Sequence, residues 1–309
     1  DFVQMEFYST WTLVALILKL GGTSPACRSG NISNTAKIKN KNKESERSKR
    51  MIKEITILPG KDKNDNKENF DQITLKAGET ISIVGPTGSG KTAFITDIEL
   101  LAQGDTSTGR YLLINGEKPA EEVRYDPSQK PIAMITQNTK CFADLSVEEF
   151  LYIHARARKI NSKKIVDDTM RLANKFTGEK ITLQNKVTLL SGGQTRSLLI
   201  ADALLIGAAP IILLDEIENA GIFKQEVIEI IKSTSKIIIF VTHDPVIALL
   251  TKKRLIMGNG AVRKILSQNE SESGAAKNLL EYDQKMGIIR ENLRAGFEIT
   301  KELVSANFA

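Results

Sequence analysis

This 309-residue chain contains a glycine-rich segment that ends in a lysine and a threonine. The segment GPTGSGKT matches the phosphate-binding pattern G-x-x-x-x-G-K-[ST] and directly follows an apolar segment predicted as a strand. Glycines let successive backbone N–H groups face phosphate oxygens, and the following helix adds a positive N-terminal end. A merely structural glycine-rich turn is disfavoured by the Lys-Thr ending. The predicted nucleotide site comprises Gly85, Pro86, Thr87, Gly88, Ser89, Gly90, Lys91 and Thr92.

Two adjacent carboxylates could supply the hydrolytic half of the chemistry. They stand in IILLDEIENAG, where Asp215 ends an apolar run and Glu216 follows it. Asp215 is placed to hold Mg²⁺ through its water shell, together with the hydroxyl of Thr92. Glu216 is placed to orient or deprotonate an attacking water, while Lys91 reaches the β- and γ-phosphates. An ordinary strand end is the alternative, which the nearby phosphate loop disfavours.

The elements that must position these residues are predicted strands. Three apolar runs, PIAMIT, PIILLD and KIIIFVTHD, have the continuous hydrophobicity of parallel strands buried on both faces. Earlier in the chain, ITILPG and DQITLKAGETISIVG also read as short strands. The later runs end in polar residues, and ligands of an open α/β sheet gather beyond the carboxyl ends of its strands.

Two further stretches are predicted to be helical. The first, DLSVEEFLYIHARARK, has Ser146 as its N-cap and Glu149 three residues on. The second begins at Asn278 and is amphipathic. Its apolar stripe, which would either pack on its own domain or dock a partner, is Tyr282, Met286, Ile289, Leu293 and Phe297.

The net charge of +6 comes from one segment, residues 36–53, which holds eight Lys or Arg against two Glu and leaves 35 basic and 35 acidic residues elsewhere. We interpret it as a solvated linker, with a foothold for RNA or anionic lipid as the alternative. The only cysteines, Cys27 and Cys141, lie far apart, which argues against a disulfide framework or zinc site and fits a reducing, cytoplasmic compartment. The apolar run Leu13–Leu18 is far shorter than the roughly 18 residues of a membrane span, so none is expected.

The segment LLSGGQTRSLLIADALL identifies a family. Its Ser191, Gly192, Gly193 and Gln194 are the signature of ATP-binding cassette (ABC) ATPases, and Ser191 lies 24 residues before Asp215, a spacing similar to that family's. Gln137 in ITQN resembles the family's Q-loop glutamine, and His243 in FVTHD resembles its switch histidine. LSVEEFLYIHARAR resembles its helical subdomain and GRYLLINGE its small β-subdomain.

The resemblance implies an α/β fold, an ABC-type P-loop NTPase core with a small antiparallel β-subdomain and a helical subdomain. The expected domains are an N-terminal segment with a basic linker at 1–50, the ABC ATPase domain at 51–266 and a C-terminal helical tail at 267–309. No internal repeat is visible, so a two-site mechanism requires a second molecule.

The resemblance also implies a mechanism with ATP and Mg²⁺ as cofactors. ATP at one phosphate loop is covered by the signature segment of a second ABC domain, in a homo- or heterodimer that hydrolysis opens. The expected catalytic residues are Glu216, His243 and Gln137, with His243 contacting the γ-phosphate. The expected metal ligands are Thr92, Gln137 and Asp215.

The sequence departs from transporter ATPases of this family in two places. No aromatic residue stands where adenine would stack, and Phe70 is too close to the phosphate loop to take that place. Ile57 or Leu58 lies in the expected neighbourhood, so adenine would be held by aliphatic packing, which leaves adenine and guanine selectivity open. After Glu216, the segment Ile217–Ile222 lacks the family's aspartate, for which Glu218 could substitute.

Three roles for the ATPase follow. The phrases LLAQGDTSTGR and LLDEIENAG resemble the ATPase that accompanies adenosylcobalamin-dependent aminomutases, so the first hypothesis is conformational work on a soluble client such as lysine aminomutase. The alternative is the nucleotide-binding subunit of an ABC transporter, which requires a separate membrane permease. The third, a nucleic-acid-associated ATPase, is supported only by the basic linker and is disfavoured.

Overall fold

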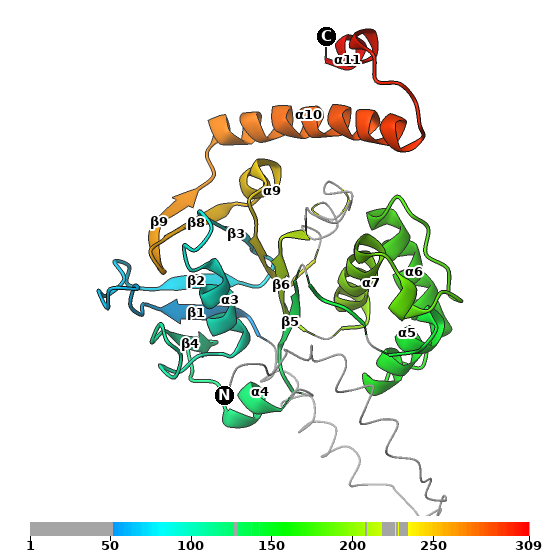
Figure 1. The fold of residues 1–309 in the computed structure, drawn as a ribbon. Helices are drawn as coiled ribbons and strands as arrows, with labels where there is room; N and C mark the ends of the chain where they lie inside the picture. The colour runs from blue at the N-terminus through cyan, green and yellow to red at the C-terminus, as the bar shows by residue number, and fades with distance from the viewer. Residues whose placement is uncertain are drawn as a thin grey trace, which may run out of the picture.

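The computed structural model describes residues 52–126, 129–136, 138–141, 143–207, 209–217, 226, 228 and 234–308. The predicted N-terminal segment and most of its basic linker lie outside these residues. So do Gln137 and Glu218. In the described ranges, the fold is a mixed α/β arrangement built on two sheets (Figure 1).

The larger sheet has the strand order β5-β6-β7-β3-β8-β9. Its strands are β3 (Thr80–Val84), β5 (Ile132–Ile135), β6 (Ile211–Asp215), β7 (Ile237–Val241), β8 (Lys253–Gly258) and β9 (Ala261–Ser267). Every pairing in it is parallel except the β8–β9 hairpin. The prediction that the three continuous apolar runs form parallel strands is therefore confirmed.

The smaller sheet is antiparallel and has the order β2-β1-β4. Its strands are β1 (Glu54–Leu58), β2 (Ile73–Lys76) and β4 (Tyr111–Ile114). The segment GRYLLINGE supplies β4, so the expected small β-subdomain is present.

The helices are α3 (Lys91–Glu99), α4 (Glu121–Tyr125), α5 (Val147–Ala157), α6 (Lys163–Phe176), α7 (Gly192–Leu205), α9 (Pro245–Leu250), α10 (Glu270–Arg294) and α11 (Lys301–Phe308), with a 3-10 turn at Val187–Leu189. Helix α6 packs against both α5 and α7, which gives the helical subdomain. The predicted cap of α5 is confirmed: the backbone N–H of Glu149 donates to Ser146 Oγ at 3.2 Å, and that of Ser146 donates to Glu149 Oε2 at 2.8 Å.

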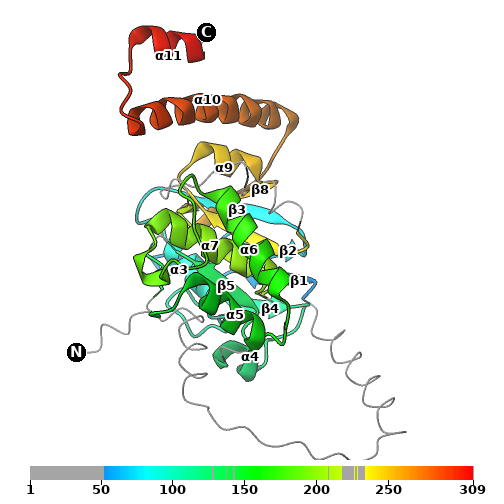
Figure 2. The same ribbon diagram turned by 90° about the vertical axis from the view of Figure 1, so that its right-hand side faces the viewer.

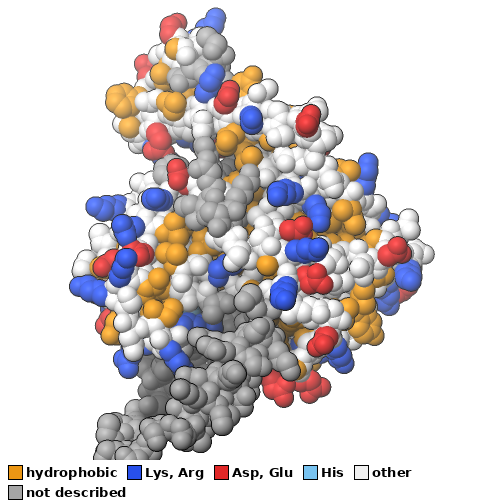
Figure 3. Space-filling model, turned by 180° about the vertical axis from the view of Figure 1, so that it is seen from behind, with side chains coloured by type: hydrophobic (Ala, Val, Ile, Leu, Met, Phe, Trp, Pro, Cys, Tyr) orange, Lys and Arg blue, Asp and Glu red, His pale blue; other side chains and the backbone are white. Residues whose placement is uncertain are grey.

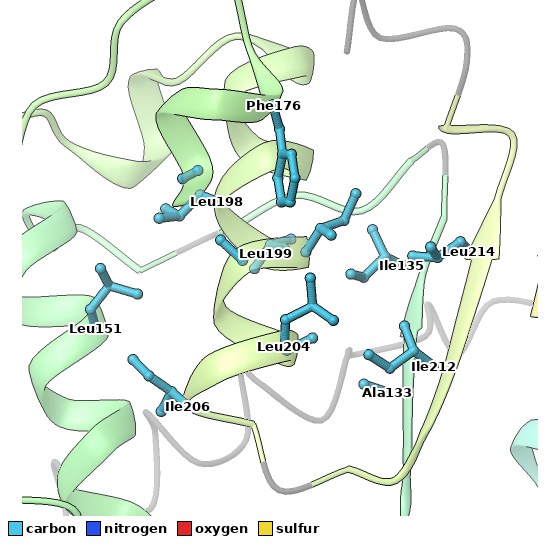
Figure 4. Close-up of a cluster of buried hydrophobic side chains, with 14 of the residues drawn as sticks. Ala133, Ile135, Leu151, Phe176, Leu198, Leu199, Leu204, Ile206, Ile212 and Leu214 are labelled. Atoms are coloured by element: carbon cyan, nitrogen blue, oxygen red, sulfur yellow. The ribbon is translucent and has the colours of Figure 1, made fainter. Parts of the chain in front are cut away.

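Alternate residues of the parallel strands point to opposite faces of the larger sheet and belong to two hydrophobic cores. On one face, Ile212 and Leu214 of β6 pack with α5, α6 and α7 (Figure 4). On the other face, Ile211 and Leu213 pack with α3 and the smaller sheet. Because both faces are covered, the strands carry almost unbroken apolar sequence.

The C-terminal tail is helical, as predicted, but α10 begins at Glu270, eight residues before Asn278. The Asn269 side chain caps it by accepting a bond from the backbone N–H of Glu272 at 2.8 Å. Helix α10 lies across α9 in both views (Figures 1 and 2). Most of the predicted stripe is exposed, namely Tyr282, Met286, Leu293 and Phe297, whereas Ile289 is half-buried. Phe297 also lies beyond the end of α10, which is Arg294.

In the ranges that the structure covers, none of the helices is both long enough and apolar enough to cross a membrane. The face opposite to Figure 1 carries interspersed basic and acidic side chains (Figure 3). That mixture agrees with the charge balance of the sequence outside the basic linker.

Candidate functional site

The candidate site is built where three neighbouring parallel strands end. Strand β7 lies between β3 and β6, and Val241 at its end pairs with both Ile83 of β3 and Asp215 of β6. The backbone continues this alignment, because Glu216 N–H donates to Val241 O at 2.9 Å and Thr242 N–H donates to Ile83 O at 3.2 Å. The segments that follow the three strands therefore emerge together at one edge of the sheet.

The phosphate loop follows β3 and leads into α3. Gly88 and Gly90 have φ values of 76° and 98°, left-handed conformations that favour glycine. A Cβ on Gly90 would also lie only 2.6 Å from the Cα of Gly260. Pro86 and Thr87 are exposed at the apex of the loop. The glycine pattern in the sequence thus reflects both turn conformation and close backbone approach.

Lys91 is the first residue of α3, and its side chain folds back over the phosphate loop. Its Nζ donates to the carbonyl oxygens of Gly85 at 2.8 Å and Pro86 at 3.1 Å. Thr92, the second residue of α3, is exposed. A cation is therefore held at the loop beside the N-terminal end of a helix, which is an arrangement that attracts phosphate groups.

The carboxylate of Glu216 faces His243 at the edge of the sheet. Oε1 of Glu216 lies 3.7 Å from Nε2 of His243, and the two side chains are 29% and 46% exposed. Glu216 has a φ of 50°, which is uncommon for a residue other than glycine and typical of functional sites. Asp215, the last residue of β6, is partly buried next to it. The structure thus brings Glu216 and His243 together at the sheet edge where Asp215 ends β6.

The signature segment begins α7, on the other side of the larger sheet from α3 (Figure 1). Ser191 caps the helix, since its Oγ accepts from Gln194 N–H at 3.3 Å and Gln194 Oε1 accepts from Ser191 N–H at 2.9 Å. Ser191 and Gly192 are exposed, and Gly193 and Gln194 are half-buried. Among the described residues, no hydrogen bond joins this segment to the phosphate loop of its own chain, and its contact with a second molecule stays a prediction.

Gln137 lies outside the described residues, so its predicted contacts are not placed. It follows β5, which is the neighbour of β6 in the sheet. Beside it, Thr136 N–H donates to Thr139 Oγ1 at 2.8 Å. Because β5 and β6 are parallel neighbours, their carboxyl ends lie at the same edge of the sheet.

The expectation that Ile57 could pack against adenine is wrong. Its side chain has no exposed surface, because it points into the core formed by α3 and the two sheets. Leu58 is half-buried, and Phe70 packs against the same core. An aliphatic adenine contact from Ile57 would require opening that core.

Lys63 and the β8–β9 turn also contact the phosphate loop, which the sequence does not predict. Lys63 Nζ donates to Gly88 O at 2.8 Å, and Gly260 N–H donates to Ser89 O at 2.8 Å. The Asn259-Gly260 pair between two apolar strands does signal a two-residue hairpin, and both residues have positive φ. Nothing in that signal tells that the hairpin contacts the phosphate loop.

A buried ionic cluster joins the elements behind the loop. The fully buried Arg110 donates to both carboxylate oxygens of Glu68, at 2.7 and 2.8 Å, and to Asp97 of α3 at 2.8 Å. It also donates to Gly260 O at 2.9 Å. Burial lowers the pKa of Arg110, but the contacts with Glu68 and Asp97 outweigh it and raise the pKa, so the guanidinium is charged.

Comparison with known proteins agrees with this geometry. The family described as ABC transporter matches residues 68–219. Over 254 residues, 82% of this chain and 97% of the relative, the chain is 47% identical to an uncharacterized ABC transporter ATP-binding protein of Methanocaldococcus jannaschii. It is 29% identical to a thiamine import ATP-binding protein of Brucella suis, covering 63% of this chain and 80% of that protein.

A solved structure supports the fold. It is an ATP-binding cassette in a dimeric, post-hydrolysis state bound to ADP and Pi, with a TM-score of 0.53 and 21% identity over 70% of this chain and 99% of that one. The phosphate loop at the strand ends defines a nucleotide-binding ATPase of the P-loop class. More narrowly, the chain belongs to the ABC transporter family, and it is an ABC-type ATPase that binds and hydrolyses ATP.

Proposed function

We propose that this chain is the nucleotide-binding subunit of an ABC transporter and that its ATP hydrolysis drives a separate membrane permease. The observation that carries the proposal is the 47% identity to an ABC transporter ATP-binding protein that is matched along 97% of its length. The import relative from Brucella suis supports the same role. In this role, the chain binds its permease at the cytoplasmic face of a membrane.

The hypothesis of a soluble aminomutase client has less support. It rests on two short phrases of the sequence, and none of the relatives reported above is named for a cobalamin-dependent enzyme. The transporter alternative fits those names better. A nucleic-acid role has no support beyond the basic linker, which lies mostly outside the described residues.

In the proposed mechanism, the phosphate loop holds the nucleotide. Its backbone N–H groups and the N-terminal end of α3 face the phosphates, and the ammonium of Lys91 moves from the loop carbonyls to the β- and γ-phosphates. Thr92, Asp215 and Gln137 would hold Mg²⁺, which neutralises developing phosphate charge when it is bound. Oxygen ligands of this kind suit that ion.

Glu216 orients or deprotonates the attacking water, and His243 contacts the γ-phosphate. Nε2 of His243 lies 3.7 Å from Oε1 of Glu216, so the imidazole can orient the carboxylate without forming a short ion pair with it. The left-handed backbone of Glu216 supports this role, because its N–H bond to Val241 fixes the turn from which the side chain projects.

The second nucleotide contact comes from another ABC domain. Ser191 and the N–H groups of Gly192 and Gly193, at the exposed start of α7, cover the nucleotide of the partner. ATP then stabilises the closed dimer, and hydrolysis removes this stabilisation because the closed state binds ATP more tightly than the products. Opening and closing transmit work to the permease.

The test uses Glu216→Gln isolated with ATP from detergent-solubilised native cells. Recovery of a multi-span membrane protein in stoichiometric amount, whose loss follows Lys91→Ala or ATP removal, is the expected result. Recovery of a cobalamin-dependent enzyme instead, without any permease, would overturn the transporter role and restore the soluble-client hypothesis.

A further inference from the structure

A lysine outside the known sequence motifs touches the phosphate loop. Lys63 lies in the connection between β1 and β2, and its Nζ donates to the carbonyl oxygen of Gly88 at 2.8 Å. Gly88 stands at the exposed apex of the loop, where the chain turns through a left-handed conformation. A positive charge is therefore placed at the loop in addition to that of Lys91.

The position of Lys63 is fixed by the β8–β9 turn. Its backbone N–H donates to Asn259 O at 3.0 Å. A Cβ on Gly260 would lie 3.0 Å from Lys63 Cγ, so the stem of the lysine runs directly over the turn. The same turn bonds the phosphate loop through Gly260 N–H and Ser89 O at 2.8 Å. Lys63 and the turn thus contact neighbouring residues of the loop.

Hydrogen bonds to Glu68 and Asp62 also hold the β1–β2 connection that carries Lys63. Glu68 accepts from Gly60 N–H at 2.9 Å and from Val262 N–H at 2.7 Å, and Arg110 neutralises it. Asp62, next to Lys63, accepts from the backbone N–H groups of Asn64 and Asn66 at 2.8 and 3.0 Å. These bonds fix the backbone on both sides of Lys63.

The neighbouring Lys61 has a different environment. Its Nζ bonds the carboxylate of Asp65 at 2.5 Å, four residues along the same connection, and the pair is exposed. No bond of Lys61 to the phosphate loop occurs among the contacts of the described residues. The chain therefore offers two lysines of equal charge, two positions apart, of which only one touches the loop.

We propose that Lys63 is a positioning residue that holds the apex of the phosphate loop and raises its affinity for di- and triphosphates. This proposal rests on nucleotide binding at Gly85–Thr92. An ammonium that donates to a peptide carbonyl polarises the same peptide unit and stabilises its orientation. Its charge also adds to the field of the loop and of the α3 N-terminus.

The proposed effect depends on phosphates and not on the base. Lys63 acts through Gly88, so ATP, GTP and ADP gain affinity together, whereas AMP, which lacks the outer phosphates, gains little. It also leaves the hydrolytic groups Glu216 and His243 in place, so the effect falls on nucleotide binding and KM more than on kcat.

The test compares Lys63→Met, Lys63→Arg and Lys61→Met in the full chain. Dissociation constants for ATP, GTP, ADP and AMP are measured by titration calorimetry, with steady-state turnover and thermal unfolding alongside. We expect Lys63→Met to weaken ATP, GTP and ADP binding about 3- to 10-fold, as loss of an exposed charged contact worth roughly 1 kcal/mol requires. Lys63→Arg restores most of the affinity, and Lys61→Met leaves it within about twofold.

Wild-type ATP affinity in Lys63→Met, or an equal loss in Lys61→Met, would overturn the proposal, because general surface charge would then explain the result. The proposal would also be overturned if Lys63→Met lowered ATP affinity and Tm together and Lys63→Arg restored neither. Lys91→Ala separates this failure from that of the site itself. If Lys91→Ala binds ATP normally, the nucleotide site is misassigned; if it does not bind while Lys63→Met does, only the role of Lys63 is wrong.

Discussion

His243 and Glu216 face each other from the ends of adjacent strands β7 and β6, with Nε2 3.7 Å from Oε1. The contact exists because Asp215 pairs with Val241 in the sheet, which aligns the residues that follow. A glutamate and an imidazole at this separation can act on one water molecule and one phosphate oxygen at the same time.

The first prediction concerns Glu216→Gln. The amide keeps the size of the side chain but cannot accept the proton of the attacking water, so turnover should fall about 10²- to 10⁴-fold. ATP binding should remain within about threefold, and light scattering should detect an ATP-dependent dimer. Glu79→Gln, which changes a carboxylate that pairs with Lys253, is the control. Near-normal turnover of Glu216→Gln would show that another group activates the water.

The second prediction is that Glu216 and His243 act as a unit. His243→Ala alone should lower kcat about 10²-fold or more. The effects of residues that act together are not additive. If the imidazole orients the carboxylate and the γ-phosphate, the variant with both Glu216→Gln and His243→Ala should therefore be no more than about tenfold slower than Glu216→Gln alone. A full product of the two losses, measured in a double-mutant cycle, would mean independent roles.

Much of this site could be predicted from the sequence because its motifs are contiguous and stand at strand ends. Gly85–Thr92, Asp215 and Glu216 needed only local pattern and the rule that parallel strands deliver their following residues to one edge. The sequence does not reveal that Ile57 is unavailable to adenine, because a strand of apolar residues does not show which side chains the second layer covers. Lys63 and Arg110 were missed because their partners lie far along the chain, at Gly88 and Glu68.

The C-terminal tail illustrates the same limit. Spacing predicted an amphipathic helix but not where it begins, because Asn269 caps it well before the apolar stripe. Spacing also left open what the stripe contacts. Ala276 is the one buried residue of α10, and it does not belong to the predicted stripe.

The third prediction tests whether the signature segment serves a second molecule. Lys91→Ala disables the phosphate loop, and Ser191→Arg disables the signature at the start of α7. Each variant alone should be inactive. When the variants are mixed in equal amounts, random pairing makes about half of the dimers mixed, and each mixed dimer has one intact composite site out of two. The activity of the mixture should therefore reach up to about a quarter of that of the wild type. Inactive mixtures, in spite of subunit exchange seen by fluorescence transfer, would place the signature outside the active site or require a different partner chain.

The fourth prediction concerns the buried cluster behind the phosphate loop. Arg110→Met removes the guanidinium and leaves Glu68 and Asp97 as uncompensated buried carboxylates, so the free energy of unfolding should fall by about 3–5 kcal/mol. Urea denaturation measures the loss. Asp65→Asn, which breaks the exposed pair with Lys61, should cost no more than about 1 kcal/mol. Similar losses in both variants would show that the cluster is solvated and does not anchor the loop.

The last prediction concerns Cys141, which lies between β5 and α5. Burial, with a smaller contribution from the negative charge of Asp202, raises the pKa of the Cys141 thiol to about 11. Only the thiolate reacts with iodoacetamide, so in a Cys27→Ser background labelling at pH 8 should be about two orders of magnitude slower than for an unperturbed thiol, and should rise about tenfold per pH unit. The urea-unfolded chain is the internal control, because there the thiol recovers its ordinary pKa and labels fast. Equal rates for the folded and unfolded chains would contradict the burial of Cys141 against the helical subdomain.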